Sequence, residues 1–203
     1  MNFHSLEDTY TLNNGVEIPI IGFGTWQTPD GDIAKHAVEV ALNAGYRHID
    51  TAAAYGNEKS VGQAIKNSGI NRHDLFITTK LWNADHGYQS TKAAIDRSLQ
   101  NLKVDYLDLY LIHWPNPVAM RDHWAEANAE RWRAMEEAVQ DGKIRSIGVS
   151  NFRKRHLDEL LKTAEIKPAV NQIMLNPSDL QPDVVKVNNE LGLLSEAYSP
   201  LGT

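Results

Sequence analysis

Strand-like apolar runs and amphipathic helical runs alternate along most of the chain, and this alternation is the feature that most constrains its fold. Segments with strand character are predicted at 21–26, 46–50, 75–80, 105–114, 143–150, 168–173 and 193–198. Segments with helical periodicity are predicted between them, at 32–44, 58–67, 90–102, 124–140, 153–164 and 180–191. Strict alternation of strand and helix predicts a parallel sheet, because each helix carries the chain back to begin the next strand in the same direction.

A short β-hairpin is predicted ahead of this alternating region. Asn14-Gly15 divides two β-prone runs within residues 9–20, and Asn-Gly between such runs is a strong hairpin signal. No low-complexity linker, charged tail or change of composition interrupts residues 1–203. We therefore predict a single domain over 1–203.

Two α/β architectures fit a parallel sheet of this kind: an open doubly wound sheet and a (β/α)₈ TIM barrel. An open sheet that binds a dinucleotide would place a G-x-G-x-x-G turn after its first strand. The chain has Gly22 and Gly24 there, but no third glycine in register. A barrel instead predicts that functional groups gather at successive strand ends, because those ends meet on one face.

The predicted strand ends carry polar or ionisable side chains, whereas the strand bodies are apolar. In chain order these residues are Asp50 with Tyr55 in the following loop, Lys80, His113, Ser150 and Asn151, Asn171 and Gln172, and Tyr198 and Ser199. This distribution favours the barrel, whose carboxyl-terminal face would bring the polar groups together.

Four of these groups together suggest a proton donor for a carbonyl compound. The phenol of Tyr55 has an ordinary pKa near ~10, which the Lys80 ammonium would lower and Asp50 would help to set. A neutral His113 could orient a carbonyl oxygen toward the phenol. A carbonyl that takes a proton on oxygen needs a hydride on carbon, and a nicotinamide is the expected hydride source.

The sequence resembles the aldo-keto reductases, and in particular their bacterial 2,5-diketo-D-gluconate and glyoxal reductase type. The matching stretches are GFGTW (22–26), AGYRHIDTAAAYGNE (44–58), LFITTKLW (75–82), DYLDLYLIHWP (105–115), GKIRSIGVSNF (142–152), AVNQI (169–173) and EAYSPLG (196–202). The resemblance covers nearly the whole chain and implies the (β/α)₈ barrel fold, with an N-terminal hairpin.

The resemblance also implies roles for individual residues. It makes Tyr55 the general acid, Lys80 and Asp50 its tuning pair, and His113 the group that orients the substrate. Around the cofactor it implies Gly24, Thr25 and Asp50 beside it, Ser150, Asn151 and Gln172 on the nicotinamide carboxamide, Tyr198 stacked on the ring, and Ser199 and Leu201 along the pyrophosphate. Trp26, Trp82 and Trp114 are implied as walls of the substrate pocket.

The family's barrel continues beyond the EAYSPLG motif, with a seventh helix, an eighth strand, an eighth helix and a C-terminal loop. We therefore expect the barrel over 1–203 to be incomplete at its C-terminus. In the family, the basic residues that hold the 2′-phosphate of NADPH belong to that later part. NADPH is expected as the cofactor from family habit, and NADH stays an alternative.

Composition narrows the classes of partner. The formal net charge is −6 and no long basic stretch is present, so nucleic acid is not expected as a partner. No run approaches the ~18 apolar residues that a membrane helix needs. The chain begins without a signal-peptide pattern and has no cysteine, which suits a cytoplasmic protein. We expect a monomer that binds a small carbonyl substrate.

The leading hypothesis is NADPH-dependent reduction of aldehydes, 2-oxoaldehydes or keto-sugars to alcohols. One alternative is a non-catalytic barrel that binds the nicotinamide cofactor. Another is a metal-dependent hydrolase that uses His48, Asp50 and His113 as ligands, although no metal site is predicted, because the later strand ends lack ligands. His48 shares strand parity with Asp50, and we interpret it as a packing residue in the layer below.

Overall fold

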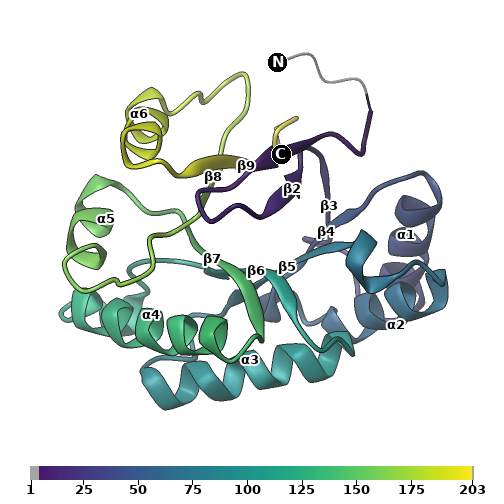
Figure 1. Ribbon diagram of the computed structural model, residues 1–203, viewed down its shortest axis with the longest axis horizontal. Coiled ribbons are helices and arrows are strands. Elements are labelled where there is room, and N and C mark those ends of the chain that lie inside the picture. Colours follow the sequence, from purple (N-terminus) through teal and green to yellow (C-terminus); the bar gives the residue numbers. More distant parts are fainter. Residues whose placement is uncertain (1–4, 203) are drawn as a thin grey trace.

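The computed structural model describes residues 5–202 and shows seven parallel strands in one curved sheet, each paired with its neighbours in chain order (Figure 1). The strands are β3 (Gly22–Gly24), β4 (His48–Asp50), β5 (Phe76–Leu81), β6 (Leu107–Ile112), β7 (Ile144–Ser150), β8 (Val170–Met174) and β9 (Leu194–Tyr198). Within the described residues β3 and β9 are the edge strands, so the barrel is nearly but not fully closed.

Within the described residues six α-helices are present. They cover the outside of this sheet (Figure 1). They are α1 (Asp32–Asn43), α2 (Glu58–Ser68), α3 (Tyr88–Leu102), α4 (Trp124–Gln140), α5 (Lys154–Leu160) and α6 (Pro182–Leu191). The predicted (β/α) barrel architecture is confirmed. In the part of the chain that the structure describes, no helix combines the length and apolar character that crossing a membrane requires.

The N-terminal hairpin is also present and closes the end of the barrel at which the parallel strands begin. Its strands β1 (Thr9–Thr11) and β2 (Glu17–Pro19) pair antiparallel. Leu12 and Ile18 are buried in one cluster with inward-facing side chains of the barrel strands, including Leu109. The hairpin therefore supplies the apolar base on which the interior of the barrel packs.

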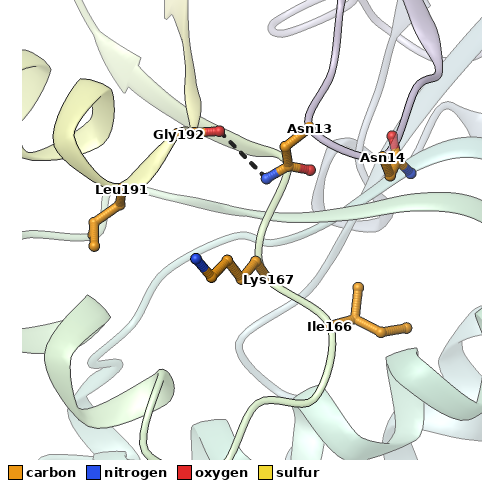
Figure 2. A pocket seen from close by; sticks show the side chains of 6 residues that line it. All are labelled: Asn13, Asn14, Ile166, Lys167, Leu191 and Gly192. Atoms are coloured by element: carbon orange, nitrogen blue, oxygen red, sulfur yellow. Dashed lines mark hydrogen bonds between the residues drawn. The ribbon is translucent and has the colours of Figure 1, made fainter.

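The hairpin turn is hydrogen-bonded to the loops at the same end of the barrel. Asn13 Nδ2 donates to the carbonyl oxygens of Pro168 and Gly192, at 2.8 and 3.3 Å. Figure 2 shows Asn13 pointing toward Gly192 at a pocket that Lys167 also lines. Asn14 Nδ2 donates to the carbonyl oxygen of Arg145 at 3.0 Å. These hydrogen bonds hold the hairpin at the end of the barrel opposite the polar carboxyl ends of the strands.

Alternation along each strand divides its side chains between the barrel interior and the helices. On β6, Leu109 and Leu111 belong to the interior cluster with the hairpin, whereas Tyr110 and Ile112 belong to the cluster under the helices. On β5, Thr79 points outward and bonds Glu58 of α2 at 2.8 Å, so Lys80 points inward. The same parity applies to the other strands and sets which polar groups face the interior.

The structure departs from the predicted elements in local detail. Three short 3₁₀ helices were not predicted: η1 (Ala53–Tyr55), η2 (Arg72–Asp74) and η3 (Val118–Met120). Helix α5 ends at Leu160, not at 164, because the amides of Lys162 and Thr163 bond carbonyls three residues back. Such bonds tighten the last turn and end the regular α-helical pattern.

Helices α2 and α3 approach each other closely at Gly62. A Cβ added to Gly62 would lie 2.5 Å from the carbonyl oxygen of Leu102, which is backbone and cannot rotate away. Alanine is normally the better helix former by about 1 kcal/mol. At this position we expect the steric contact to outweigh that preference.

Gly62→Ala is expected to lower the free energy of unfolding by about 1–3 kcal/mol, the usual cost of overpacking a tight contact. Denaturant unfolding followed by circular dichroism measures this. Lys66→Ala, at an exposed position of the same helix, is the control and should change stability by less than about 0.5 kcal/mol. A Gly62→Ala protein as stable as the wild type would contradict the close-packing account.

Candidate active site

A buried ion pair joins the ends of β4 and β5 inside the barrel. Lys80 Nζ donates to Asp50 Oδ1 at 2.5 Å and to the carbonyl oxygen of Thr51 at 3.0 Å. Only 1% of Lys80 is exposed. The two strands are neighbours in register, with Asp50 opposite Thr78, so inward parity places Lys80 just above Asp50. A lysine this buried needs such partners to remain charged.

Tyr55 folds back over this pair. The backbone of Ala52 is extended, the turn Ala53–Tyr55 is 3₁₀ helical, and Gly56 ends the turn with φ +71°. A positive φ of this kind suits glycine. The Tyr55 hydroxyl lies 3.5 Å from Lys80 Nζ. The loop thus brings the phenol, the ammonium group and the Asp50 carboxylate into one contiguous group.

The pKa of Tyr55 is raised above its ordinary value. Burial raises it most, the nearby Lys80 ammonium lowers it, and the Asp50 carboxylate raises it again. The predicted effect of Lys80 is therefore present, but the desolvation of the phenol exceeds it. The phenol stays protonated in the absence of ligands, as a proton donor must before it reacts.

Lys80 keeps its proton firmly. Burial alone lowers the pKa of Lys80, but Asp50 and Tyr55 raise it by more, so the net shift is upward. The ammonium group is therefore a permanent positive charge beneath the Tyr55 hydroxyl. Such a charge stabilises the phenolate that Tyr55 would become after it gives up its proton.

His113 follows β6 and lies beside Tyr55. Its ring centroid is 5.9 Å from that of Tyr55 and 5.4 Å from that of Trp82. Among the described residues its buried Nδ1 atom has no hydrogen-bond partner. Burial, reinforced by Lys80, lowers the pKa of His113 to about 4. The imidazole is therefore neutral near neutral pH and can donate through one nitrogen.

We expect the His113 imidazole to titrate near pH 4 in an NMR titration, well below its ordinary value of 6.5. Between these two values the unfolded chain binds a proton at this residue and the folded protein does not. His113 therefore contributes stability above pH 6.5, and that contribution is lost as the pH falls from 6.5 toward 4. His113→Gln should show a shallower loss of unfolding free energy over this window. A slope equal to that of the wild type would contradict the assignment.

Polar side chains from β7, β8 and β9 form a second group beside the first. Ser150 Oγ donates to the carbonyl oxygen of Gln172 at 2.9 Å. Asn151 Nδ2 donates to Ser150 Oγ and to the His113 carbonyl oxygen, both at 3.1 Å. The Tyr198 hydroxyl donates to Asn151 Oδ1 at 2.9 Å. Asn151 has φ +64°, an uncommon conformation for a residue other than glycine, and the network holds it there.

These side chains fit a nicotinamide carboxamide. That group carries one carbonyl acceptor and one amide donor. Gln172 Oε1 can accept from the amide, and the Ser150 hydroxyl or the Asn151 amide can donate to the carbonyl by exchanging a present hydrogen bond. On the other side, a Cβ added to Gly24 would meet nothing within 4 Å, so space is open in front of β3. Thr25 is fully buried next to this space, and its Oγ1 donates to the Asp50 carbonyl oxygen at 3.2 Å.

Two of the predicted cofactor residues lie apart from this group. Ser199 follows β9 and has φ +49°, and its carbonyl oxygen accepts from the Gly202 amide at 3.0 Å. Leu201 is 98% exposed. Within the described residues the structure brings neither side chain against Asp50, Tyr55, Lys80 and His113 or against the group formed by Ser150, Asn151 and Gln172.

The three predicted pocket tryptophans are exposed on the same face as the strand ends. Trp26 is 58% exposed and its ring lies 5.0 Å from that of Tyr55. Trp82 is 38% exposed and contacts His113. Trp114 is 43% exposed and directly follows His113. Large aromatic side chains left open to solvent around polar groups are typical of a ligand-binding surface.

The loops that carry Trp82 and Trp114 are held from below by α4. Asn128 Nδ2 donates to the Pro115 carbonyl oxygen at 2.9 Å, which anchors the loop after β6. Buried Arg131 lies 3.2 Å from His86 Nδ1 in the loop after β5, and its other nitrogen donates to Asn128 Oδ1. These contacts connect both loops to the same helix, α4.

The three ligands of the alternative metal hydrolase, His48, Asp50 and His113, are not grouped around one point. His48 is buried one layer below Asp50, where its Nε2 lies 2.9 Å from Thr78 Oγ1 and its ring packs against Phe76. The carboxylate of Asp50 is occupied by Lys80. In residues 5–202, no three histidine, cysteine or acidic side chains are grouped as a metal site.

One residue of the site was missed by the sequence analysis. Glu196, on β9, lies within the barrel and accepts a hydrogen bond from Gln172 Nε2 at 3.0 Å. Its position two residues before Tyr198 gives it the same inward parity, which was the available signal.

Comparison with known proteins gives a consistent assignment. The family model described as "Aldo/keto reductase family" matches residues 20–203. The glyoxal reductase of Bacillus subtilis (strain 168) is 50% identical over 197 residues, which are 97% of this chain and 68% of that protein. This chain therefore spans about two thirds of the length of that relative.

Solved structures agree with the sequence relatives. The crystal structure of an aldo/keto reductase from Brucella melitensis superposes with a TM-score of 0.90 at 48% identity, covering 97% of this chain and 74% of that one. An aldo-keto reductase from Bombyx mori, solved in complex with NADP, gives a TM-score of 0.85 at 38% identity, covering 95% of this chain and 66% of that one. The matched family model and these likenesses show that the chain belongs to the aldo/keto reductase family.

Proposed function

We propose that this protein reduces aldehydes, 2-oxoaldehydes and keto-sugars to alcohols with NADPH, and that Tyr55 is the general acid. The family reduces carbonyl compounds with NADP(H) in general, and this chain is one of its oxidoreductases. The named substrates, the preference for NADPH over NADH and the residue roles are the content of the proposal.

The observation that carries the proposal is the position of Lys80 Nζ between a carboxylate and a phenol. It lies 2.5 Å from Asp50 Oδ1 and 3.5 Å from the Tyr55 hydroxyl. A barrel that only bound a cofactor would have no need to bury a lysine against a tyrosine hydroxyl at the mouth. This arrangement prepares the phenol to lose a proton when negative charge develops next to it.

In the proposed reaction the chain's own residues handle the proton. Neutral His113 and the Tyr55 hydroxyl hold the carbonyl oxygen of the substrate by hydrogen bonds. Tyr55 gives its proton to that oxygen as negative charge develops there, and the O–H bond of the alcohol forms. The Lys80 ammonium stabilises the remaining phenolate until a proton from solvent restores the phenol.

The reaction needs a hydride as well as a proton. When bound, NADPH supplies the hydride that forms the new C–H bond at the carbonyl carbon. Ser150, Asn151 and Gln172 are proposed to hold its carboxamide, and Tyr198 to lie against its ring. Gly24 and Thr25 are proposed to leave room beside it.

The substrate class follows from the chemistry of the mouth. Trp26, Trp82 and Trp114 offer aromatic walls, which suit the apolar or planar part of an aldehyde. The neutral His113 imidazole and the Tyr55 phenol lie among these rings, and both can donate a hydrogen bond to a carbonyl oxygen. This combination favours small uncharged carbonyl compounds over charged ones.

An assay of NADPH consumption tests the proposed function. Methylglyoxal, benzaldehyde and a keto-sugar are compared as substrates, and NADPH is compared with NADH for the best of them. Turnover that requires both carbonyl compound and NADPH supports the proposal. A protein that binds NADPH but reduces none of these compounds would refute the proposed substrate class.

A monomeric state in the cytoplasm is part of the same proposal. Light scattering after size-exclusion chromatography is expected to give the mass of one chain. A stable dimer would correct this part without affecting the proposed chemistry.

A further inference from the structure

A second carboxylate, that of Glu196, lies near Asp50 and has no role in the reaction as proposed above. Glu196 Oε2 accepts from Gln172 Nε2 at 3.0 Å, and the same nitrogen donates to Asp50 Oδ2 at 2.8 Å. The other oxygen of Glu196 lies 3.8 Å from His48 Nε2. Gln172 therefore stands between two acidic side chains.

The barrel topology explains how these groups meet. Gln172 on β8 and Glu196 on β9 are direct partners in the parallel register. Asp50 lies on β4, far from both along the sheet order, so its contact with Gln172 crosses the barrel interior. Gln172 thus connects the side of the barrel that carries the ion pair with the side that carries Tyr198.

The two carboxylates fix which way the Gln172 amide faces. Its NH₂ group has two hydrogens, and one can go to each acidic side chain. The opposite orientation would place the amide oxygen against the carboxylate oxygens of Asp50, and two facing acceptors form no hydrogen bond. The amide nitrogen is therefore held toward the carboxylates, and Oε1 is the atom left for a ligand.

The environment of Glu196 is compatible with this role in either protonation state. Burial raises its pKa, His48 lowers it, Asp50 raises it, and Gln172 and Lys80 lower it, with a net upward shift. An ionised Glu196 accepts from Gln172 with either oxygen. A protonated Glu196 still has a carbonyl oxygen that can accept the same bond.

We propose that Glu196 is a positioning residue that fixes the Gln172 amide, so that Gln172 Oε1 accepts from the amide group of the nicotinamide carboxamide. The proposal rests on the cofactor contacts of the proposed function. It assigns Glu196 no contact with substrate and no part in proton transfer. Its effect is transmitted through Gln172 and is expected in the affinity for NADPH.

The test is a set of NADPH titrations followed by tryptophan fluorescence, which need no turnover. Glu196→Leu removes the acceptor and is expected to raise the Kd for NADPH about tenfold, because one hydrogen bond to a carboxylate is lost. Glu196→Gln keeps an acceptor oxygen in the same place and should stay within about threefold of the wild type. Ser195→Ala is the control: it removes a hydroxyl that faces Asn188 of α6 on the outer side of β9, and it should leave Kd unchanged.

A double-variant cycle separates positioning from a general structural effect. If Glu196 acts through Gln172, Glu196→Leu should have little further effect on Kd in a Gln172→Leu background. An equal loss of affinity in both backgrounds would overturn the proposal, and so would an unchanged Kd in Glu196→Leu alone. Thermal unfolding of every variant shows which proteins are folded before they are compared.

The outcome is independent of whether the proposed substrates are right. Wild-type protein that binds NADPH without reducing any aldehyde would refute the proposed function, yet the titrations would still test Glu196. Conversely, normal turnover with an unchanged Kd in Glu196→Leu would refute the positioning role and leave the proposed function in place.

Discussion

Tyr55→Phe is expected to lower kcat for aldehyde reduction by about 10² to 10⁴-fold, the usual contribution of a general acid. The substitution removes only the hydroxyl group, so the ring still packs beside Trp26 and His113. Affinity for NADPH should be close to that of the wild type, since the residues proposed to hold the cofactor are unchanged. Steady-state kinetics and an NADPH titration on the same sample measure both quantities.

Tyr106→Phe is the matched control for this experiment. It removes a hydroxyl that lies 3.2 Å from His73 Nδ1. Tyr106 directly precedes β6, at the end of the barrel away from the polar carboxyl ends of the strands. Its kcat should equal that of the wild type. If Tyr55→Phe kept wild-type kcat, Tyr55 could not be the proton donor, and the proposed mechanism would have to be abandoned.

Lys80→Met is expected to impair both stability and turnover. The substitution leaves the Asp50 carboxylate inside the barrel without its cation, and breaking a buried ion pair in this way typically costs about 3–5 kcal/mol of unfolding free energy. Turnover should fall as well, because the phenolate of Tyr55 would form without a neighbouring positive charge. Denaturant unfolding and steady-state kinetics measure the two effects.

The double variant Lys80→Met/Asp50→Leu separates these effects. Replacing both charges by apolar groups removes the unpaired carboxylate, so most of the lost stability should return. Activity should not return, because the ammonium group is still missing. Recovery of turnover in the double variant would show that Lys80 has only a structural role, and full stability of Lys80→Met would contradict the importance of the buried pair.

The main features of the fold could be predicted because they depend on periodicity. The alternation of strand and helix indicated a parallel sheet, and the polar groups at successive strand ends favoured a barrel over an open sheet. The inward parity of Asp50 and Lys80 follows from counting residues along two neighbouring strands. The polar strand ends suggested where the site should be. These features could be predicted without tertiary information because strand parity and helix periodicity are local properties of the sequence.

Other features depended on contacts that sequence cannot supply. Whether burial or Lys80 dominates the pKa of Tyr55 is decided by how deeply the 3₁₀ turn Ala53–Tyr55 places the phenol. The link from Glu196 through Gln172 to Asp50 joins three strands across the barrel. The resemblance implies a place for Leu201 along the pyrophosphate of the cofactor. Its side chain is 98% exposed, and that role stays a prediction.

The most direct test of the central claim follows the hydride itself. The protein is given benzaldehyde and NADPH deuterated at both positions of nicotinamide C4, and the alcohol is examined by mass spectrometry. The account predicts benzyl alcohol with one deuterium on the former carbonyl carbon, formed in equal amount to the NADPH consumed. Protein that binds the deuterated cofactor but forms no labelled alcohol would contradict the claim that this site reduces carbonyl groups.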